Sequence, residues 1–73
     1  MTKDFHPNRL RVILAEKQKK NRWLAEQLGK SEMTISRWST NKVQPSLTQL
    51  IEIAKLLHVK LDDLVEPYNL NND

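Results

Sequence analysis

Apolar residues recur at helical spacing along most of the chain, and this pattern predicts five helices and no strands. The expected helices cover about residues 8–17, 21–28, 32–38, 46–57 and 61–65. The first has Leu10, Ile13 and Leu14 on one face. The fourth has an unusually broad apolar face, made of Leu47, Leu50, Ile51, Ile53, Ala54 and Leu57. We therefore expect an all-α domain with the fourth helix at the centre of its core.

Residues that favour helix ends mark several of these boundaries. Gly29 directly follows the apolar stripe that ends at Leu28, and glycine adopts the left-handed conformation of a C-terminal cap, which costs other residues roughly 1 kcal/mol. Ser31 is a suitable N-cap for the next helix. Ser46 and Gln49 have the spacing of a capping box. The second and third helices are therefore joined by a very short turn.

Helices joined by so short a turn must cross closely. Ala25 supplies a small side chain at the expected crossing, and Ile35 and Trp38 lie three residues apart on the inner face of the third helix. We expect Trp38 in the core, and Trp23 at the surface over the first helix. The segment has the arrangement of a helix-turn-helix.

The residues of this segment resemble the phage-repressor-like family, also called Cro/C1 or XRE type. The resemblance runs from about residue 10 to residue 64, and its most specific residues are Asn21-Arg22-Trp23-Leu24-Ala25-Glu26-Gln27-Leu28-Gly29-Lys30-Ser31, Thr34-Ile35-Ser36-Arg37-Trp38, Asn41-Lys42 and Pro45-Ser46-Leu47. It implies a five-helix lambda-repressor-like DNA-binding domain over residues 1–66. Residues 67–73 are expected to form a polar C-terminal tail.

In this family the second helix of the motif lies in the major groove of DNA, with its N-terminal residues toward base edges. The matching positions, expected to read bases, are Glu32, Met33, Ser36 and Arg37. Arg37 can donate two hydrogen bonds to guanine. Met33 suits a thymine methyl group or, alternatively, packing against a neighbouring side chain. Glu32 suits a cytosine amino group or simply the positive end of its own helix.

Cations surround the expected N-terminus of the second helix, where most helices prefer carboxylates. Lys19, Lys20 and Arg22 become favourable there if a DNA phosphate binds the free N–H groups. The resemblance assigns a phosphate contact to Asn21, and one to the loop of Asn41 and Lys42. The expected phosphate-binding residues are thus Lys20, Asn21, Arg22, Thr34, Asn41 and Lys42, although the Thr34 hydroxyl can equally satisfy the first turn of its helix.

Several positions depart from the family pattern. Lys20 replaces the usual Ser or Thr cap, so we expect the cap to shift to Asn21. Leu14 and Ser39 stand where the family often pairs arginine with glutamate, which predicts an apolar contact instead of an ion pair. Asparagine and histidine replace glycines that are usual in the family, and asparagine tolerates the same left-handed conformation. These two positions are Asn41 and His58.

The charge distribution agrees with a polyanionic partner. Residues 1–46 contain ten Lys or Arg and four Asp or Glu, a net charge of +6, whereas residues 47–73 have a net charge of −3. DNA would be steered toward the basic half, and its affinity would fall with salt. Alternatively, the lysines only solubilise an exposed surface. Cysteine is absent, no apolar run approaches the roughly 18 residues of a membrane span, and the start is polar, so we expect a cytoplasmic protein of bacterial or phage type.

Two other functional classes fit the sequence less well. An enzyme would need a reactive cluster, but His6 and His58 lie 52 positions apart, so we expect no catalysis, metal or cofactor. A protein-interaction module of antitoxin or anti-repressor type stays open. The favoured interpretation is a sequence-specific transcriptional regulator, such as a repressor. We expect it to bind double-stranded DNA at a pseudo-palindromic operator as a homodimer. No membrane or small-molecule partner is expected. The expected dimer contacts are Leu61, Val65, Tyr68 and Leu70.

Overall fold

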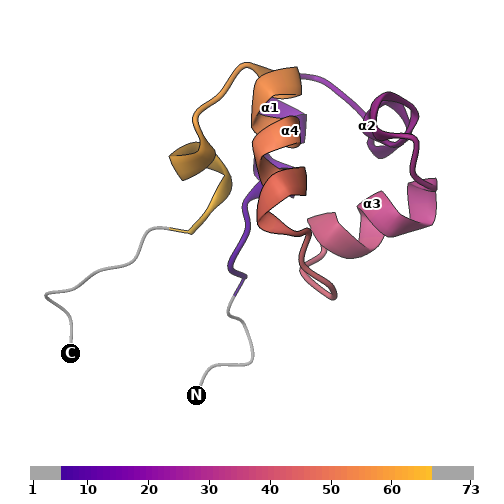
Figure 1. The fold of residues 1–73 in the computed structure, drawn as a ribbon, viewed down its shortest axis with the longest axis horizontal. Coiled ribbons are helices and arrows are strands. Elements are labelled where there is room, and N and C mark those ends of the chain that lie inside the picture. Colours follow the sequence, from indigo (N-terminus) through magenta and orange to yellow (C-terminus); the bar gives the residue numbers. More distant parts are fainter. Residues whose placement is uncertain (1–5, 67–73) are drawn as a thin grey trace, which may run out of the picture.

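The computed structural model describes residues 6–66, and these residues form four α-helices and one short 3-10 helix. The elements are α1 (Leu10–Glu16), α2 (Asn21–Leu28), α3 (Glu32–Ser39), α4 (Leu47–Leu57) and η1 (Leu61–Leu64). Figure 1 shows α2 and α3 on one side of α4 and η1 on the other. The all-α class expected from the sequence is confirmed. Tyr68 and Leu70, and the tail to which they belong, lie outside the described residues.

The expected fifth α-helix is a single 3-10 turn. Asp63 N–H donates to the Lys60 carbonyl oxygen at 2.9 Å, three residues back, and no longer helix follows because Val65 is extended (φ −116°, ψ 150°). Val65 forms an isolated antiparallel bridge with Asn8, so pairing with the N-terminal segment ends the helix. The same pairing moves the start of α1 from residue 8 to Leu10, whose N–H donates to Asn8 Oδ1 at 3.0 Å.

Local capping determines the other helix ends largely as predicted. Gly29 is left-handed (φ 67°) and ends α2. Ser31 Oγ accepts from Thr34 N–H at 3.1 Å, and both bonds of the Ser46–Gln49 capping box are present. The predicted cap shift in α2 is wrong: Lys20 is the N-cap residue, in extended conformation, and its side chain makes no capping hydrogen bond. The first turn of α2 therefore begins without a side-chain acceptor.

The core contains residues from every helix. Its largest fully buried side chains are Leu10, Leu24, Ile35, Ile53 and Leu64. Trp38 is 4% exposed, as predicted for a core residue, and Ala25 is also buried. Leu14 and Ser39 are both buried, and Ser39 Oγ donates to the Ser36 carbonyl oxygen rather than to an ionic partner.

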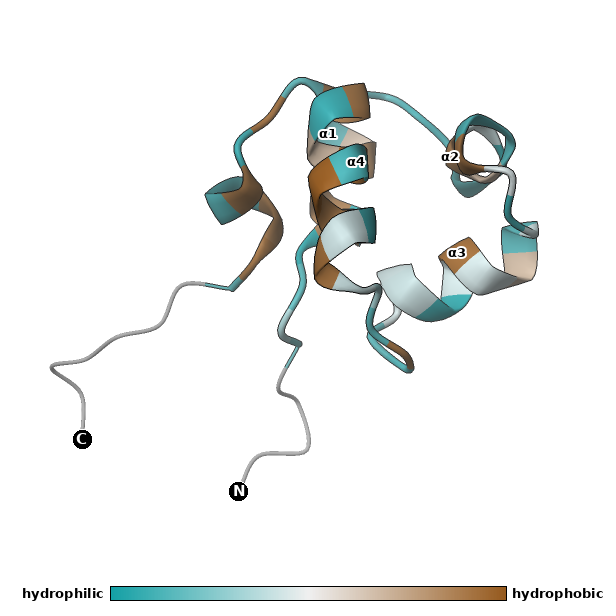
Figure 2. Cartoon of the chain, viewed as in Figure 1, coloured by the Kyte–Doolittle hydropathy of each residue, from teal (hydrophilic) through white to brown (hydrophobic). Residues whose placement is uncertain are grey.

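The broad apolar face of α4 is only partly in the core. Ile53, Ala54 and Leu57 are buried, but Leu47 is 63% exposed and Ile51 39%. The elements packed on α4 therefore cover a narrower arc of the helix than its apolar sequence offers, and part of that face stays exposed. Figure 2 shows the hydrophobic residues along α4 and the adjoining elements.

Backbone hydrogen bonds join the two ends of the described chain. Arg9 N–H donates to the Leu64 carbonyl oxygen at 2.8 Å, and Glu66 N–H donates to the Pro7 carbonyl oxygen at 2.8 Å. These bonds fix η1 against the start of α1. None of the helices within residues 6–66 is long and apolar enough to cross a bilayer.

Candidate nucleic-acid interface

The outer face of α3 carries the residues that the sequence predicts to read bases. Glu32, Met33 and Arg37 are exposed and Ser36 is half-buried. Met33 is 63% exposed, so packing within the chain engages little of its side chain. The ion pair found among residues 6–66 joins Arg22 and Glu26. Within these residues, no carboxylate therefore pairs with the Arg37 guanidinium. The face is therefore open to a ligand.

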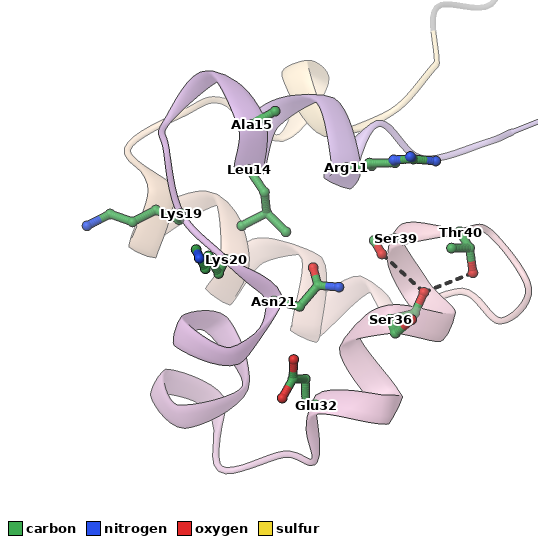
Figure 3. A pocket seen from close by; sticks show the side chains of 10 residues that line it. All are labelled: Arg11, Leu14, Ala15, Lys19, Lys20, Asn21, Glu32, Ser36, Ser39 and Thr40. Atoms are coloured by element: carbon green, nitrogen blue, oxygen red, sulfur yellow. Dashed lines mark hydrogen bonds between the residues drawn. The ribbon is translucent and has the colours of Figure 1, made fainter.

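Beside this face lies an open groove of about 490 Å³ between α1, the start of α2 and α3 (Figure 3). Three cationic side chains line it, Arg11, Lys19 and Lys20, against one carboxylate, that of Glu32. In Figure 3 the Asn21 amide points into the groove, whereas Lys19 points away from it. The groove is thus suited to an anion. Arg11 was missed by the sequence analysis because it lies on α1, outside the helix-turn-helix motif.

Hydroxyl groups near the groove are already engaged. Ser39 and Thr40 both donate to the Ser36 carbonyl oxygen, at 3.1 and 2.8 Å (Figure 3). The Thr34 hydroxyl is 2.9 Å from Ser31 Oγ, and either can be the donor. The cations and the Asn21 amide, rather than the hydroxyls of Ser39 and Thr40, are therefore free to donate hydrogen bonds to a ligand in the groove.

The N-terminus of α2 combines free backbone amides with cations. The first helical bond runs from Leu24 N–H to the Lys20 carbonyl oxygen, and α2 has no acidic residue in its first turn. Arg22 pairs with Glu26 at 3.7 Å, and both side chains are largely exposed. Lys19 Nζ lies 4.7 Å from the ring centroid of Trp23, which is half-buried. The partial positive charge at this helix end and the nearby cations both attract an anion.

The loop after α3 is held by Asn41, which is left-handed (φ 63°) as predicted. Its side-chain amide is bonded to the backbone of Asn8, at 3.0 and 3.1 Å, so its polar atoms have partners within the chain. Lys42, the next residue, is exposed, and its N–H donates to the Arg37 carbonyl oxygen at 2.9 Å. The loop thus presents a lysine from a fixed backbone next to α3.

No group of three His, Cys, Asp or Glu side chains that could hold a metal ion occurs within the part of the chain that the structure describes. His6 and His58 are both exposed. His58 adopts the left-handed conformation (φ 58°) and caps the C-terminus of α4, so this residue has a structural role.

Comparison with known proteins decides the family. Residues 9–69 match the Cro/C1-type HTH DNA-binding domain. The chain belongs to this family. The Cro/C1-type match covers all four α-helices in full, so it includes both the outer face of α3 and the start of α2.

A solved structure agrees with this assignment. A crystal structure from Bacteroides fragilis, of a protein provisionally described as DNA-binding, is 60% identical in sequence and has a TM-score of 0.81. The match covers 82% of this chain and 97% of that one. No curated protein has a significant match to the chain. The protein is thus a Cro/C1-type DNA-binding domain, and its similarity to the Bacteroides protein extends over most of both chains.

Proposed function

We propose that this Cro/C1-type domain is a transcriptional regulator that recognises a specific sequence in double-stranded DNA. The observation that carries the proposal is the outer face of α3, where Met33 and Arg37 are exposed beside a groove lined by cations. In helix-turn-helix proteins such a face lies in the major groove. The regulator would act in the cytoplasm of a bacterial or phage-infected cell, with residues 1–66 as its DNA-binding domain.

Base recognition would come from Glu32, Met33, Ser36 and Arg37. Arg37 is suited to a bidentate contact with guanine O6 and N7, worth about 1–3 kcal/mol of discrimination. Met33 offers an apolar surface to a thymine methyl group, and its exposure supports this role over packing. Glu32 lies at the start of α3 and can accept from a cytosine amino group.

Phosphate groups would bind on both sides of α3. On one side, a phosphate would accept from the first N–H groups of α2 and from its polar side chains, Lys20, Asn21 and Arg22, with the Thr34 hydroxyl as a further candidate. On the other side, the candidates are Lys42 and Asn41. Because the Asn41 amide already binds residue 8, Lys42 would carry most of the contact there.

A homodimer on a pseudo-palindromic operator completes the proposal. One small helix-turn-helix domain contacts few base pairs. Two copies spaced about 34 Å apart on one face of the duplex double the number of base pairs that are contacted. The dimer requires no small-molecule ligand.

Selection of bound sites from random duplex DNA with the full chain tests this function. We expect an enriched motif with two inverted half-sites at moderate salt. If the bound duplexes stay as random as the input pool, the proposal is wrong, and the protein-interaction class, in which α3 binds another protein, takes its place.

A further inference from the structure

The side chain of Asn8 joins the start of α1 to the C-terminal end of α3. Its Oδ1 accepts from Leu10 N–H at 3.0 Å, at the beginning of α1. Its Nδ2 donates to the Trp38 carbonyl oxygen at 2.9 Å and to Gln44 Oε1 at 2.6 Å. Only 5% of Asn8 is exposed. One buried amide therefore binds α1, α3 and the loop between α3 and α4 at the same time.

The partners of this amide determine which way it faces. Leu10 N–H can only donate and the Trp38 carbonyl oxygen can only accept, so Oδ1 faces α1 and Nδ2 faces α3. A serine at position 8 would keep an acceptor for the start of α1. Its hydroxyl has one hydrogen, so it cannot donate to both Trp38 and Gln44. Asn8→Ser therefore separates the capping of α1 from the bonds to α3 and its loop.

The loop that carries Lys42 leaves α3 at the carbonyl group that Asn8 binds. Asn41 N–H also donates to the Trp38 carbonyl oxygen, at 3.0 Å. Lys42 N–H donates to the Arg37 carbonyl oxygen at 2.9 Å. The exposed Lys42 side chain thus starts from a backbone that is bonded to the last turn of α3. The bonds from Asn8 tie this turn and the loop to α1.

We propose that Asn8 is a positioning residue for DNA binding, which holds Lys42 where its ammonium group reaches a phosphate. Asn8 is too deeply buried to contact DNA itself, so it acts through the loop. This inference rests on the proposed function, because that function assigns the phosphate contact to Lys42. It adds a residue that precedes the helix-turn-helix and whose effect on DNA binding is indirect.

A loop that is fixed in the free protein favours binding. A mobile loop would lose backbone freedom when its lysine binds a phosphate, and that loss opposes association. Here the loop is ordered when the domain folds, so DNA binding does not have to order it. The same bonds keep Lys42 at a constant separation from Arg37, the proposed base reader. The phosphate contact and the base contact then form in one register on the duplex.

A purely structural role for Asn8 predicts a different result. Loss of a structural residue lowers the stability of the domain but leaves each DNA contact of the folded protein intact. Loss of a positioning residue lowers the contribution of Lys42 in particular, because the lysine is no longer held near its phosphate. The coupling between Asn8 and Lys42 in DNA binding therefore distinguishes the two roles.

A double-mutant cycle measures this coupling. The full chain with Asn8→Ser, Lys42→Ala or both is bound to a duplex recovered in the selection described above, over a range of salt concentrations. We expect Lys42→Ala to weaken binding by about 5-fold more in the parent chain than in the Asn8→Ser chain. We also expect each single variant to lower the slope of log affinity against log salt by about 0.9, and the double variant to lower it no further.

Val59→Ala is the matched control for stability. Val59 is half-buried after α4 and packs against the core, so its truncation destabilises the domain. Its apolar side chain takes no part in the hydrogen bonds of the loop. We expect Lys42→Ala to weaken binding as much in the Val59→Ala chain as in the parent. Urea denaturation ranks the stabilities, and circular dichroism confirms that each variant is folded in the assay buffer.

Amide hydrogen exchange of the free protein is a second measurement, which needs no DNA. Asn8→Ser is expected to accelerate exchange of Lys42 N–H about 10-fold more than exchange of Ile53 N–H, in the middle of α4. Val59→Ala should show no such preference for Lys42, because it destabilises the domain without releasing the loop.

Equal weakening by Lys42→Ala in the parent and Asn8→Ser chains would overturn the inference, as would equal acceleration of exchange at Lys42 and Ile53. A coupling of the same size with Val59→Ala would also overturn it, since any destabilised chain would then show the effect. If the parent chain enriches no duplex, the proposed function is wrong, and this inference is wrong with it whatever the exchange rates.

Discussion

Asn8 and Asn41 exchange two hydrogen bonds across 33 residues of sequence. Asn41 Oδ1 accepts from the Asn8 backbone N–H at 3.0 Å, and Asn41 Nδ2 donates to the Asn8 carbonyl oxygen at 3.1 Å. The Asn8 side chain, buried at 5% exposure, in turn donates to the Trp38 carbonyl oxygen at 2.9 Å and to Gln44 Oε1 at 2.6 Å. The segment before α1 therefore holds the loop that presents Lys42.

Asn41→Gly removes this pair while it keeps the left-handed backbone free of strain. Hydrogen bonds of this kind contribute about 0.5–1.5 kcal/mol each, so we expect a loss of about 1–3 kcal/mol in the free energy of unfolding. Asn41→Asp keeps the acceptor but sets a carboxylate oxygen against the Asn8 carbonyl oxygen, so we expect it to lose at least as much stability as Asn41→Gly. Urea denaturation measures all three proteins. An Asn41→Gly variant as stable as the parent would show that the pair contributes nothing.

Gly29 and His58 are both left-handed helix caps, at φ 67° and 58°. Gly29→Ala should destabilise the domain by about 1 kcal/mol, from backbone strain alone, because nothing lies within 4 Å of the added Cβ. His58→Gly should have the opposite sign and stabilise it by up to about 1 kcal/mol. Thermal and urea unfolding report both. A stable Gly29→Ala variant would contradict the conformational argument.

Arg37→Ala tests base recognition. We expect affinity for the selected duplex to fall by about 1–3 kcal/mol, and the preference for guanine to relax at one position in each half-site. Binding to unrelated DNA should change far less. Lys60→Ala, an exposed cation directly before η1, serves as the control. An unchanged motif after a repeated selection with Arg37→Ala would exclude this residue as a base reader.

Salt dependence tests the groove. Each phosphate contact made by a cation contributes about 0.9 to the slope of log affinity against log salt on B-DNA. We expect Lys20→Ala and Arg11→Ala each to lower that slope by about 1, without altering the selected motif. Lys60→Ala should leave the slope unchanged. If Arg11→Ala also leaves it unchanged, the groove beside α1 does not hold DNA.

The local features of this fold could be predicted from the sequence. Gly29, Ser31 and the Ser46–Gln49 pair form bonds or conformations within about four residues of themselves, so the residue type and its spacing suffice. Trp38 was expected in the core from its spacing to Ile35 for the same reason. The cationic start of α2 was also visible, since charge and helix position are both local properties.

The sequence by itself determined the helices, their principal caps, the inner face of α3 and the family. The tertiary structure decided that Arg11 on α1 lines the groove, that Asn8 holds Asn41, and that Leu47 and Ile51 stay exposed on a helix whose sequence is apolar over a wide arc. Pairing with Asn8 also made the last helix a 3-10 turn. The physical reason is range: a cap is satisfied within one turn, whereas burial and long-range hydrogen bonds depend on which segments pack together, and residue spacing carries no information on that.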